Sequence, residues 1–563
     1  MKPEHFDAVV VGSGFGGSVT AYRLAEAGWR VCVLERGKPY PPGSFPRSPR
    51  QMAGNFWNPR RGLQGLFEIW TFRGLEAVVA SGLGGGSLIY ANVLLRKDER
   101  WFVEDGPDGS SRPWPVTRED LEPHYARVEE GIGVDSYPAG ALPYSNTPKT
   151  VAFQTAARRL GVDWQLPPLA VTFANGKNPP VPGEPIEDGH NLHGRPRSTC
   201  TLCGECDVGC NYGSKNTMDL TYLTRFADLG GEIRSRCEVR RFEPRPEGGF
   251  TIRYVRHRDE DEGRPVRRSR LPHETVSADR LVLAAGTLGT NFLLLRNRSA
   301  FPRLSPRLGT GFCGNGDVLG FVLRPRVMEN GEVVIRALDP DYGPVITSAM
   351  RVPDALDGGR GRGFYLEDGG YAHFLSWVTE AFHVPGTARR ALTFAARRIW
   401  NQLVAAPVSN LSGEMAALLG DGSASSARLP MLGMGRDTPD GNLFLRGGYL
   451  ESDWTIRTSR AYIDRVRGLM AAVARALGAR FADNPLWYFK RVVTVHPVGG
   501  SPMGESRHQG VVDSYGQVFG YPGLSIADAS VMPGPVGPNP SLTIAALADR
   551  FADWMIDHPR VKP

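Results

Sequence analysis

The sequence lacks any strong clustering of charge. It contains no long block of like charges, and its 66 Lys and Arg residues only slightly outnumber its 59 Asp and Glu residues, for a net charge of +7. Nucleic-acid-binding arms need clustered basic residues, so nucleic acid is not an expected partner. A hydrophobic fraction of 41% and a charged fraction of 22% are typical of a folded globular protein and exclude general disorder.

Long hydrophobic runs are also lacking. Met1–Asp7 is polar, and the apolar run that follows, Ala8–Val11, is too short for the core of a signal peptide. The stretch 77–95 is uncharged and nearly long enough to span a membrane. Its many Gly and Ser residues favour a ligand-binding loop instead. We therefore expect a cytoplasmic protein.

Cysteine is scarce, and its distribution excludes a secreted disulfide scaffold. Four of the seven cysteines crowd into the segment 200–210. These four are Cys200, Cys203, Cys206 and Cys210. The spacing is that of an iron–sulfur run, and zinc is an alternative, but Asn211 stands where such a run has proline. Metal-free thiols are the favoured interpretation, and a metal site stays the alternative.

Glycine, by contrast, is abundant, and its clearest use is near the amino terminus. Gly and Pro together make up about a fifth of the chain. The pattern predicts a buried strand over 6–11, the turn Gly12-Ser-Gly-Phe-Gly-Gly17, a helix over 18–27 and a second strand over 30–34. Glu35 ends this unit, at the distance expected of a carboxylate that binds a ribose hydroxyl. A strand–helix–strand unit with this turn predicts a dinucleotide site.

A second glycine cluster helps to choose the dinucleotide. Glu35 beside Arg36 favours FAD or NAD over NADP, because the carboxylate needs a free ribose hydroxyl. The run Ser81-Gly-Leu-Gly-Gly-Gly-Ser87 could hold a further stretch of a long cofactor, which favours FAD. Two distant segments are predicted to join the same domain: a strand over 280–285, and a strand over 524–527 followed by a helix over 541–556.

The chain resembles a known family over most of its length. The opening unit, Gly84–Leu88, Val495–Gly500 and the tail from Ala527 to Ala548 are similar to the glucose–methanol–choline (GMC) oxidoreductases, and within these to the cholesterol-oxidase branch. The resemblance implies FAD and an α/β fold. A Rossmann-type FAD-binding domain (1–120, 226–320 and 485–563) would be joined to a substrate domain (121–225 and 321–484) built on a mixed or antiparallel sheet.

The fingerprint and the resemblance together predict the cofactor contacts. They are Gly12, Gly14, Phe15, Gly16, Gly17, Glu35, Arg36, Gly85, Gly86, Ser87, Asn92, Val239, Ala285, Asp528 and Ala529. One departure from the family concerns the loop after the second glycine cluster. Tyr90 stands where the family usually has asparagine, and Asn92 follows two residues later.

The resemblance also implies a catalytic pair. His496 follows a β-branched run and precedes Pro497, so it sits where a strand ends, and it matches the family's proton acceptor. An imidazole with its ordinary pKa of about 6.5 is mostly neutral near neutral pH and can take a hydroxyl proton. Asn539 lies between Pro538 and Pro540, in a rigid turn that could fix the substrate oxygen.

These features predict an FAD-dependent oxidase of a bulky, apolar, sterol-like secondary alcohol. The hydride would go to flavin N5, and O2 or an electron-acceptor protein would reoxidise the flavin. Two alternatives stay open: lyase chemistry without net redox, as in the family's hydroxynitrile lyases, and a dehydrogenase that passes electrons through a cysteine-bound cluster to a partner.

Two substrate features complete the expectations. The glutamate that shifts a double bond in related cholesterol oxidases is replaced near Leu375–Ser376, with Glu367 and His373 as candidate substitutes, so isomerase activity is doubtful. Ala388–Val404 has apolar residues at helical spacing with paired arginines. Such a helix could make peripheral membrane contact, although a surface helix of the substrate domain is favoured.

Overall fold

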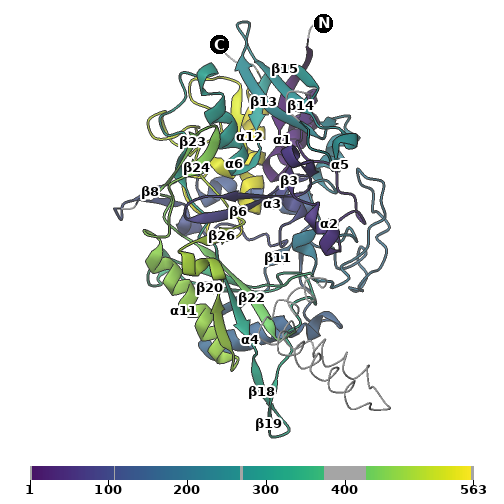
Figure 1. Cartoon of the computed structure of the whole chain (residues 1–563), viewed down its shortest axis with the longest axis vertical. Coiled ribbons are helices and arrows are strands. Elements are labelled where there is room, and N and C mark those ends of the chain that lie inside the picture. The colour runs from purple at the N-terminus through teal and green to yellow at the C-terminus, as the bar shows by residue number, and fades with distance from the viewer. Residues whose placement is uncertain (1–2, 107, 267–270, 373–425, 560–563) are drawn as a thin grey trace, which may run out of the picture.

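The computed structural model describes residues 3–106, 108–266, 271–372 and 426–559. Figure 1 shows both chain ends at one end of an elongated molecule, beside α1, α12 and strands β13 to β15. The opposite half contains α4, α11, β20 and β22, and β6 and β26 lie between the halves. The helices described include α1 (Phe15–Glu26), α2 (Pro49–Ala53), α3 (Arg118–Ile132), α4 (Pro148–Leu160), α5 (Tyr222–Asp228), α6 (Gly286–Arg296), α11 (Arg460–Ala476) and α12 (Ser541–Asp557).

A seven-stranded mixed sheet forms the half that holds the termini. Its path runs β12 (Glu232–Arg234), β2 (Val31–Leu34), β1 (Glu4–Val11), β15 (His273–Leu283), β14 (Phe250–Arg256) and β13 (Cys237–Pro244), and β27 (Leu524–Ile526) pairs with β15. The strands β12, β2, β1, β15 and β27 pair in parallel, whereas β14 runs antiparallel to both neighbours. β2 and the second half of β1, Ala8–Val11, are apolar and buried on both faces, because helices cover a parallel sheet.

A six-stranded antiparallel sheet forms the other half. Its order is β10 (Asp163–Gln165), β20 (Ala349–Val352), β21 (Phe364–Asp368), β22 (Arg428–Gly435), β17 (Val318–Leu323) and β25 (Arg480–Asp483). Each neighbouring pair is antiparallel. The expected fold class, a Rossmann-type sheet beside a second, antiparallel sheet, is confirmed. The expected domain boundaries stay a prediction.

A third sheet connects the two halves near the middle of the molecule. β26 (Val492–Thr494) pairs in parallel with β6 (Leu75–Ala80), which forms a hairpin with β5 (Phe67–Thr71). The remaining described strands form small sheets: β3 (Trp57–Asn58) with β4 (Leu63–Gln64), β7 (Val103–Asp105) with β8 (Ser111–Pro113), β9 (Asp135–Ser136) with β11 (Pro168–Leu169), β16 (Thr310–Phe312) with β23 (Gly441–Arg446) and β24 (Tyr449–Ser452), and β18 (Arg326–Glu329) with β19 (Glu332–Ile335).

The turn from β1 into α1 requires glycine for two separate reasons. Gly12 has a φ of +103°, which side chains rarely adopt, and a Cβ there would lie 2.3 Å from the Ala284 carbonyl oxygen. Gly16 lies inside α1, where a Cβ would lie 1.7 Å from the carbonyl oxygen of Ala527. The first turn of α1 therefore packs directly on the ends of β15 and β27. No described helix is long and apolar enough to cross a bilayer.

Candidate active site

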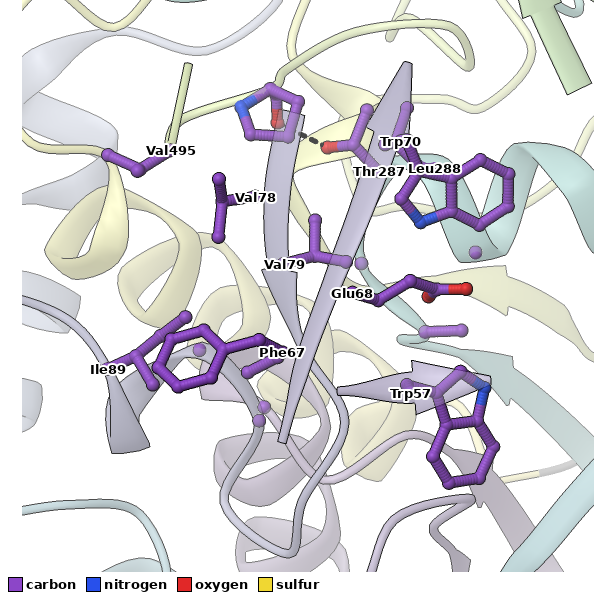
Figure 2. A pocket seen from close by; sticks show the side chains of 18 of the residues that line it. Trp57, Phe67, Glu68, Trp70, Val78, Val79, Ile89, Thr287, Leu288 and Val495 are labelled. Carbon is purple, nitrogen blue, oxygen red and sulfur yellow. Dashed lines mark hydrogen bonds between the residues drawn. The ribbon is translucent and has the colours of Figure 1, made fainter. Parts of the chain in front are cut away.

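One large cavity opens between the two major sheets, with a volume of about 1420 Å³. Figure 2 shows part of its wall, where β5 and β6 cross the view with Phe67, Val78 and Val79, and Val495 and Trp57 lie on opposite sides. Most of the expected site residues line this cavity. They are Gly12, Gly14, Phe15, Gly16, Glu35, Arg36, Gly85, Gly86, Val239, Ala285, Asp528, Ala529, His496 and Asn539.

The two glycine-rich loops meet at Ser13. The Ser13 hydroxyl donates to Glu35 Oε2 at 2.6 Å and accepts from the backbone N–H of Gly84 at 3.0 Å. Gly85 packs so closely on Gly14 that a Cβ on Gly85 would lie 2.6 Å from the Gly14 Cα. Glu35 is also held from the other side, because Oε1 accepts the Gly37 N–H at 2.7 Å. Hydrogen bonds within the protein thus hold both loops in place.

Three expected cofactor residues do not line the cavity, and two of them, Gly17 and Ser87, have structural partners instead. A Cβ on Gly17 would lie 2.0 Å from the Gly12 carbonyl oxygen, so Gly17 serves helix packing. The Ser87 hydroxyl donates to the Gly84 carbonyl at 2.7 Å and accepts from Met218 N–H at 2.9 Å, which fixes the loop. Asn92 is fully buried with a φ of 72°, at the sharp bend after Tyr90. Their direct contact with a cofactor stays a prediction.

The carboxyl-terminal contribution centres on Asp528, directly after β27. Its carboxylate accepts from Ser530 N–H at 2.9 Å and from the Thr290 hydroxyl of α6 at 2.5 Å. Burial raises the pKa of Asp528 above its ordinary value. The start of α6 and the turn 529–531 are therefore joined through this carboxylate at the edge of the cavity.

β3 and β5 form one part of the cavity wall. Arg36 forms an ion pair with Glu68 of β5, and its guanidinium lies 5.2 Å from the centre of the Trp57 ring of β3. Figure 2 shows Glu68 and Trp57 in this part of the wall, and the Thr287 hydroxyl donating to the Pro497 carbonyl, a bond of 2.6 Å. Arg36 thus joins the segment after β2 to this part of the wall. Its side chain was expected to contact the cofactor, and that contact stays a prediction.

The cavity fits FAD by its room and by its open glycine positions. A Cβ on Gly86 would meet nothing within 4 Å, and one on Gly14 would come no closer than 4.0 Å to any neighbour, so backbone is bare on the cavity side. Pockets for one small ligand usually measure about 300–1000 Å³. The larger volume here has room for a dinucleotide and a substrate together. The start of α1 would hold the pyrophosphate, and Glu35 a ribose hydroxyl.

His496 lies in the cavity wall just beyond β26, with 15% of its side chain exposed. Its Nδ1 is 2.9 Å from Oδ1 of Asp317, which is nearly fully buried. Asp317 Oδ2 accepts from Val495 N–H at 2.9 Å and lies 2.9 Å from the Thr494 hydroxyl. The carboxylate therefore fixes Nδ1 as the protonated nitrogen, by the usual inference from its partner. No hydrogen bond from a described residue reaches Nε2.

Asn539 lines the same cavity as His496 and is held through its preceding turn. Asn315 accepts from Val536 N–H at 2.7 Å and Gly537 N–H at 3.1 Å, and it donates to the Pro538 carbonyl at 3.0 Å. Asn315 and Asp317 stand two residues apart in one loop. This loop thus holds the turn before Asn539 through Asn315 and holds His496 through Asp317.

Glu367 of β21 is the acid beside Asn539. Asn539 Nδ2 lies 3.4 Å from Glu367 Oε2, and the Asn539 Oδ1 and Glu367 Oε1 atoms are buried without a hydrogen-bond partner among the described residues. Burial raises the pKa of Glu367 to about 8. Of the two candidate substitutes for the family's glutamate, Glu367 is therefore next to the expected catalytic asparagine. His373 and the segment Leu375–Ser376 lie outside the described residues, as does the helix expected over Ala388–Val404.

Sequence reasoning missed Asp317 and Asn315. The run Cys313-Gly-Asn-Gly-Asp317 reads as an ordinary turn, and no local signal shows which distant residues its side chains reach. Glu367 was named, but only as one of two substitutes. Each missed contact spans more than 170 positions of the chain or joins separate sheets, which sequence spacing does not reveal.

The cysteine run does not bring metal ligands together in this structure. Within the described ranges, which include all seven cysteines, the one group of three or more His, Cys, Asp or Glu residues whose ligand atoms all lie within 4.8 Å of one another is His124, Asp549 and Asp553. Arg23 and Arg127 form ion pairs with both of those carboxylates, so this group is an ion-pair network joining α1, α3 and α12. Burial raises the pKa of Cys200, Cys203 and Cys206, which favours neutral thiols.

Comparison with known proteins agrees with this geometry. The family model described as FAD dependent oxidoreductase matches residues 7–171, and two models described as GMC oxidoreductase match residues 189–314 and 434–548. A cholesterol oxidase of Mycobacterium tuberculosis (strain ATCC 25618 / H37Rv) is 30% identical, over 98% of this chain and 91% of that protein. A long-chain-alcohol oxidase of Arabidopsis thaliana is 23% identical, over 98% of this chain and 67% of that protein.

Among solved structures, a pyridoxine 4-oxidase from Mesorbium loti superposes with a TM-score of 0.57 at 18% identity, covering 97% of this chain and 98% of that one. At that identity the likeness shows the shared fold. The full-length match at 30% identity and the three family models show the family. The chain belongs to the GMC oxidoreductases and is an FAD-dependent alcohol oxidoreductase.

Proposed function

We propose that this protein oxidises a bulky, apolar secondary alcohol, sterol-like in shape, to the ketone. The observation that carries the proposal is the joint placement of His496 and Asn539 in the wall of the cavity that also holds the dinucleotide fingerprint. The neighbouring wall on the side of the second sheet is apolar. It includes Leu319, Val345, Ile346, Pro430 and Leu432.

In the proposed reaction His496 is the base. Its Nε2 takes the hydroxyl proton, and Asp317 stabilises the imidazolium that results while keeping the ring oriented. Asn539 donates from its amide to the substrate oxygen, and its flanking prolines limit movement. FAD supplies the acceptor for the hydrogen and the two electrons that leave the carbinol carbon. Leucine and valine side chains exclude water around the reacting carbon.

Anaerobic bleaching of the flavin tests the proposal. Mixing the holoenzyme with sterols, long-chain alcohols and sugars in a stopped-flow instrument should show reduction by the apolar secondary alcohols. His496→Gln should slow that reduction about 10²–10⁴-fold, the usual contribution of a positioned base. His190→Gln, in an exposed pair with Asp228, is the matched control. A flavin that stays oxidised with every alcohol, while a product still forms, would point to lyase chemistry.

The acceptor that reoxidises the flavin belongs to the same proposal. Because the relatives include a cholesterol oxidase of Mycobacterium tuberculosis and a long-chain-alcohol oxidase of Arabidopsis thaliana, we favour O2 over an electron-transfer partner fed through a metal centre. Equal yields of hydrogen peroxide and ketone are expected in air. Fast reduction of a dye with little peroxide would favour the dehydrogenase.

A second candidate activity is the shift of a double bond after oxidation. Glu367 favours it, because burial beside Asn539 raises its pKa to about 8 and makes its carboxylate form a stronger base. That form would take a proton from the carbon between the ketone and the double bond and return it to the far end of the double bond. Oxidation of an alcohol whose ketone carries a β,γ double bond, one carbon short of conjugation, tests this, because ultraviolet absorbance reports the conjugated product. Glu367→Gln should accumulate the unconjugated ketone.

A further inference from the structure

The turn that precedes Asn539 has few hydrogen-bond donors of its own. It reads Pro533-Gly-Pro-Val-Gly-Pro538, so three of its six residues lack an N–H group, and all six are buried outside any helix or strand. No backbone N–H in the described part of the chain donates to any of its six carbonyls. Buried carbonyls are normally hydrogen-bonded, so this turn depends on side chains from elsewhere in the chain.

Lys97 supplies two of the missing hydrogen bonds. Its side chain is fully buried, and Nζ donates to the carbonyl of Pro535 at 2.8 Å and to that of Val536 at 2.9 Å. The centre of the Trp114 ring lies 4.3 Å from Nζ. No carboxylate of a described residue forms an ion pair with Lys97, and the neighbouring Asp98 interacts with it through charge alone. Fully buried lysines usually pair with an acid, so the turn itself explains the place of this one.

The backbone of Lys97 is itself held, so its side chain starts from a fixed point. Arg118 of α3 donates from Nη1 to the Lys97 carbonyl at 2.7 Å. The Tyr125 hydroxyl of α3 lies 3.4 Å from the Lys97 backbone nitrogen and 2.9 Å from the Thr543 hydroxyl of α12. Lys97 is therefore connected to the chain on both sides of Asn539, directly to the turn before it and through Tyr125 to the helix after it.

Lys97 and Asn315 bind different groups of the same turn. Asn315 binds two of its N–H groups and the Pro538 carbonyl, whereas Lys97 binds two other carbonyls. Lys97 is not among the described residues that line the cavity, but Asn539 is. Lys97 therefore acts on the reaction only through the residues that it binds. Such an action is large enough to measure, because displacing an orienting group by about 1 Å can slow a reaction about 10²-fold.

We propose that Lys97 is a positioning residue for Asn539, and that it holds the turn so that the asparagine amide meets the oxygen of the alcohol. The inference rests on the proposed role of Asn539 and adds the residue that orients it. Without the amino group, two buried carbonyls lose their donor and the turn relaxes toward other partners. The loss falls on the rate of the reductive step more than on affinity, because the apolar wall that contacts the substrate is unchanged.

A double-mutant cycle on the rate of anaerobic flavin reduction tests the proposal, with the secondary alcohol that reduces the wild-type holoenzyme fastest. Lys97→Met keeps most of the side-chain stem and removes its donors. It should slow flavin reduction about 10-fold or more and change the dissociation constant of the alcohol less than about 2-fold. In an Asn539→Ala background the same change should slow reduction less than about 2-fold, because no amide is left to position.

Lys149→Met is the matched control. Lys149 is also fully buried, and its Nζ donates to the carbonyls of Pro344 and Val345, both at 2.6 Å. Loss of these bonds leaves two buried carbonyls without a donor, but not in the turn before Asn539. The effect of Lys149→Met on the rate should therefore be the same with and without Asn539→Ala. The same additivity for Lys97→Met would assign Lys97 a general structural role and overturn the inference.

Failure of this inference and failure of the proposed function give different results. A wild-type rate in Asn539→Ala alone would overturn the proposed role of Asn539. Crystal structures of the wild-type and Lys97→Met holoenzymes test the positioning without turnover. The variant should show the turn and the Asn539 side chain displaced, and an unmoved Asn539 would overturn the inference whether or not any alcohol is oxidised. If Lys97→Met does not fold, Lys97→Gln, which is shorter but keeps N–H donors, takes its place in both experiments, with a smaller loss expected.

Discussion

Buried carboxylates in the two halves of the molecule differ in their hydrogen bonding. On the Rossmann-type side, Glu35 accepts hydrogen bonds from Ser13 and Gly37, and Asp528 accepts from Ser530 and Thr290. On the side of the antiparallel sheet, Glu367 has one long contact of 3.4 Å, and its Oε1 atom has no hydrogen-bond partner among the described residues. Satisfied carboxylates build a rigid binding surface, whereas a poorly hydrogen-bonded one is free to hold a proton.

Two glycines beside the cavity differ in the same way, since Gly16 is tightly packed and Gly86 is open, and this difference gives the prediction with the largest effect. Gly16→Ala in α1 should abolish folded, FAD-loaded protein, because the new Cβ would overlap the rigid backbone of Ala527. Gly86→Ala should instead fold and lose flavin, since its Cβ would enter only the open cavity. Flavin content per folded chain, from the absorbance ratio and circular dichroism, separates the two. Gly140→Ala, which has open space and an ordinary φ, is the control; a yellow, stable Gly16→Ala protein would contradict the packing argument.

Asp317→Asn tests whether the satisfied carboxylate beside His496 acts through the imidazole. An asparagine amide cannot accept from Val495 and Thr494 while also fixing Nδ1–H, so the ring loses its orientation and tautomer. The rate of anaerobic flavin reduction should fall about 10²-fold or more, with little change in the dissociation constant of the alcohol. Asp354→Asn, at a buried acid outside the cavity, is the comparison. Equal loss of binding and rate would assign Asp317 a general structural role.

Glu367→Gln tests the raised pKa of this poorly hydrogen-bonded carboxyl through the pH dependence of stability. The unfolded chain releases the Glu367 proton near pH 4.5, whereas the folded protein keeps it until about pH 8. The wild type therefore loses folding free energy as pH rises through this window, on the order of 2–4 kcal/mol in all. The variant lacks that loss. Urea unfolding at about pH 5 and about pH 8.5 should show Gln gaining on the wild type at the higher pH; parallel pH profiles would contradict the raised pKa.

Gly468→Ala should have the smallest effect and the opposite sign. Gly468 lies on the exposed face of α11, where a Cβ would meet nothing within 4 Å. Alanine in a helix interior is more stable than glycine by about 0.5–1 kcal/mol, because it loses less backbone entropy on folding. The melting temperature should therefore rise slightly, without any change in flavin content. A loss of stability would mean that this helical glycine, like Gly16, packs against something.

The local sequence pattern predicted several elements of the fold close to their observed positions. The strand expected over 6–11, the helix over 18–27 and the helix over 541–556 correspond to β1, α1 and α12, with ends shifted by up to three residues. The glycine fingerprint and Glu35 line the cavity as expected, because their spacing along one strand–helix–strand unit fixes their geometry. Gly17 belongs to the same unit and Ser87 to the second glycine cluster, yet both pack against other loops and do not line the cavity.

The sequence by itself thus determined the features that depend on residues close together in the chain. These are the alternation of strand and helix, the turns that require glycine, and the resemblance to a family. Only the tertiary structure decided which distant groups meet. Asp317 reaches His496 and Glu367 reaches Asn539 across separate elements. The reason is physical: burial and hydrogen bonding, which set the protonation of these acids, depend on surroundings assembled from remote parts of the chain.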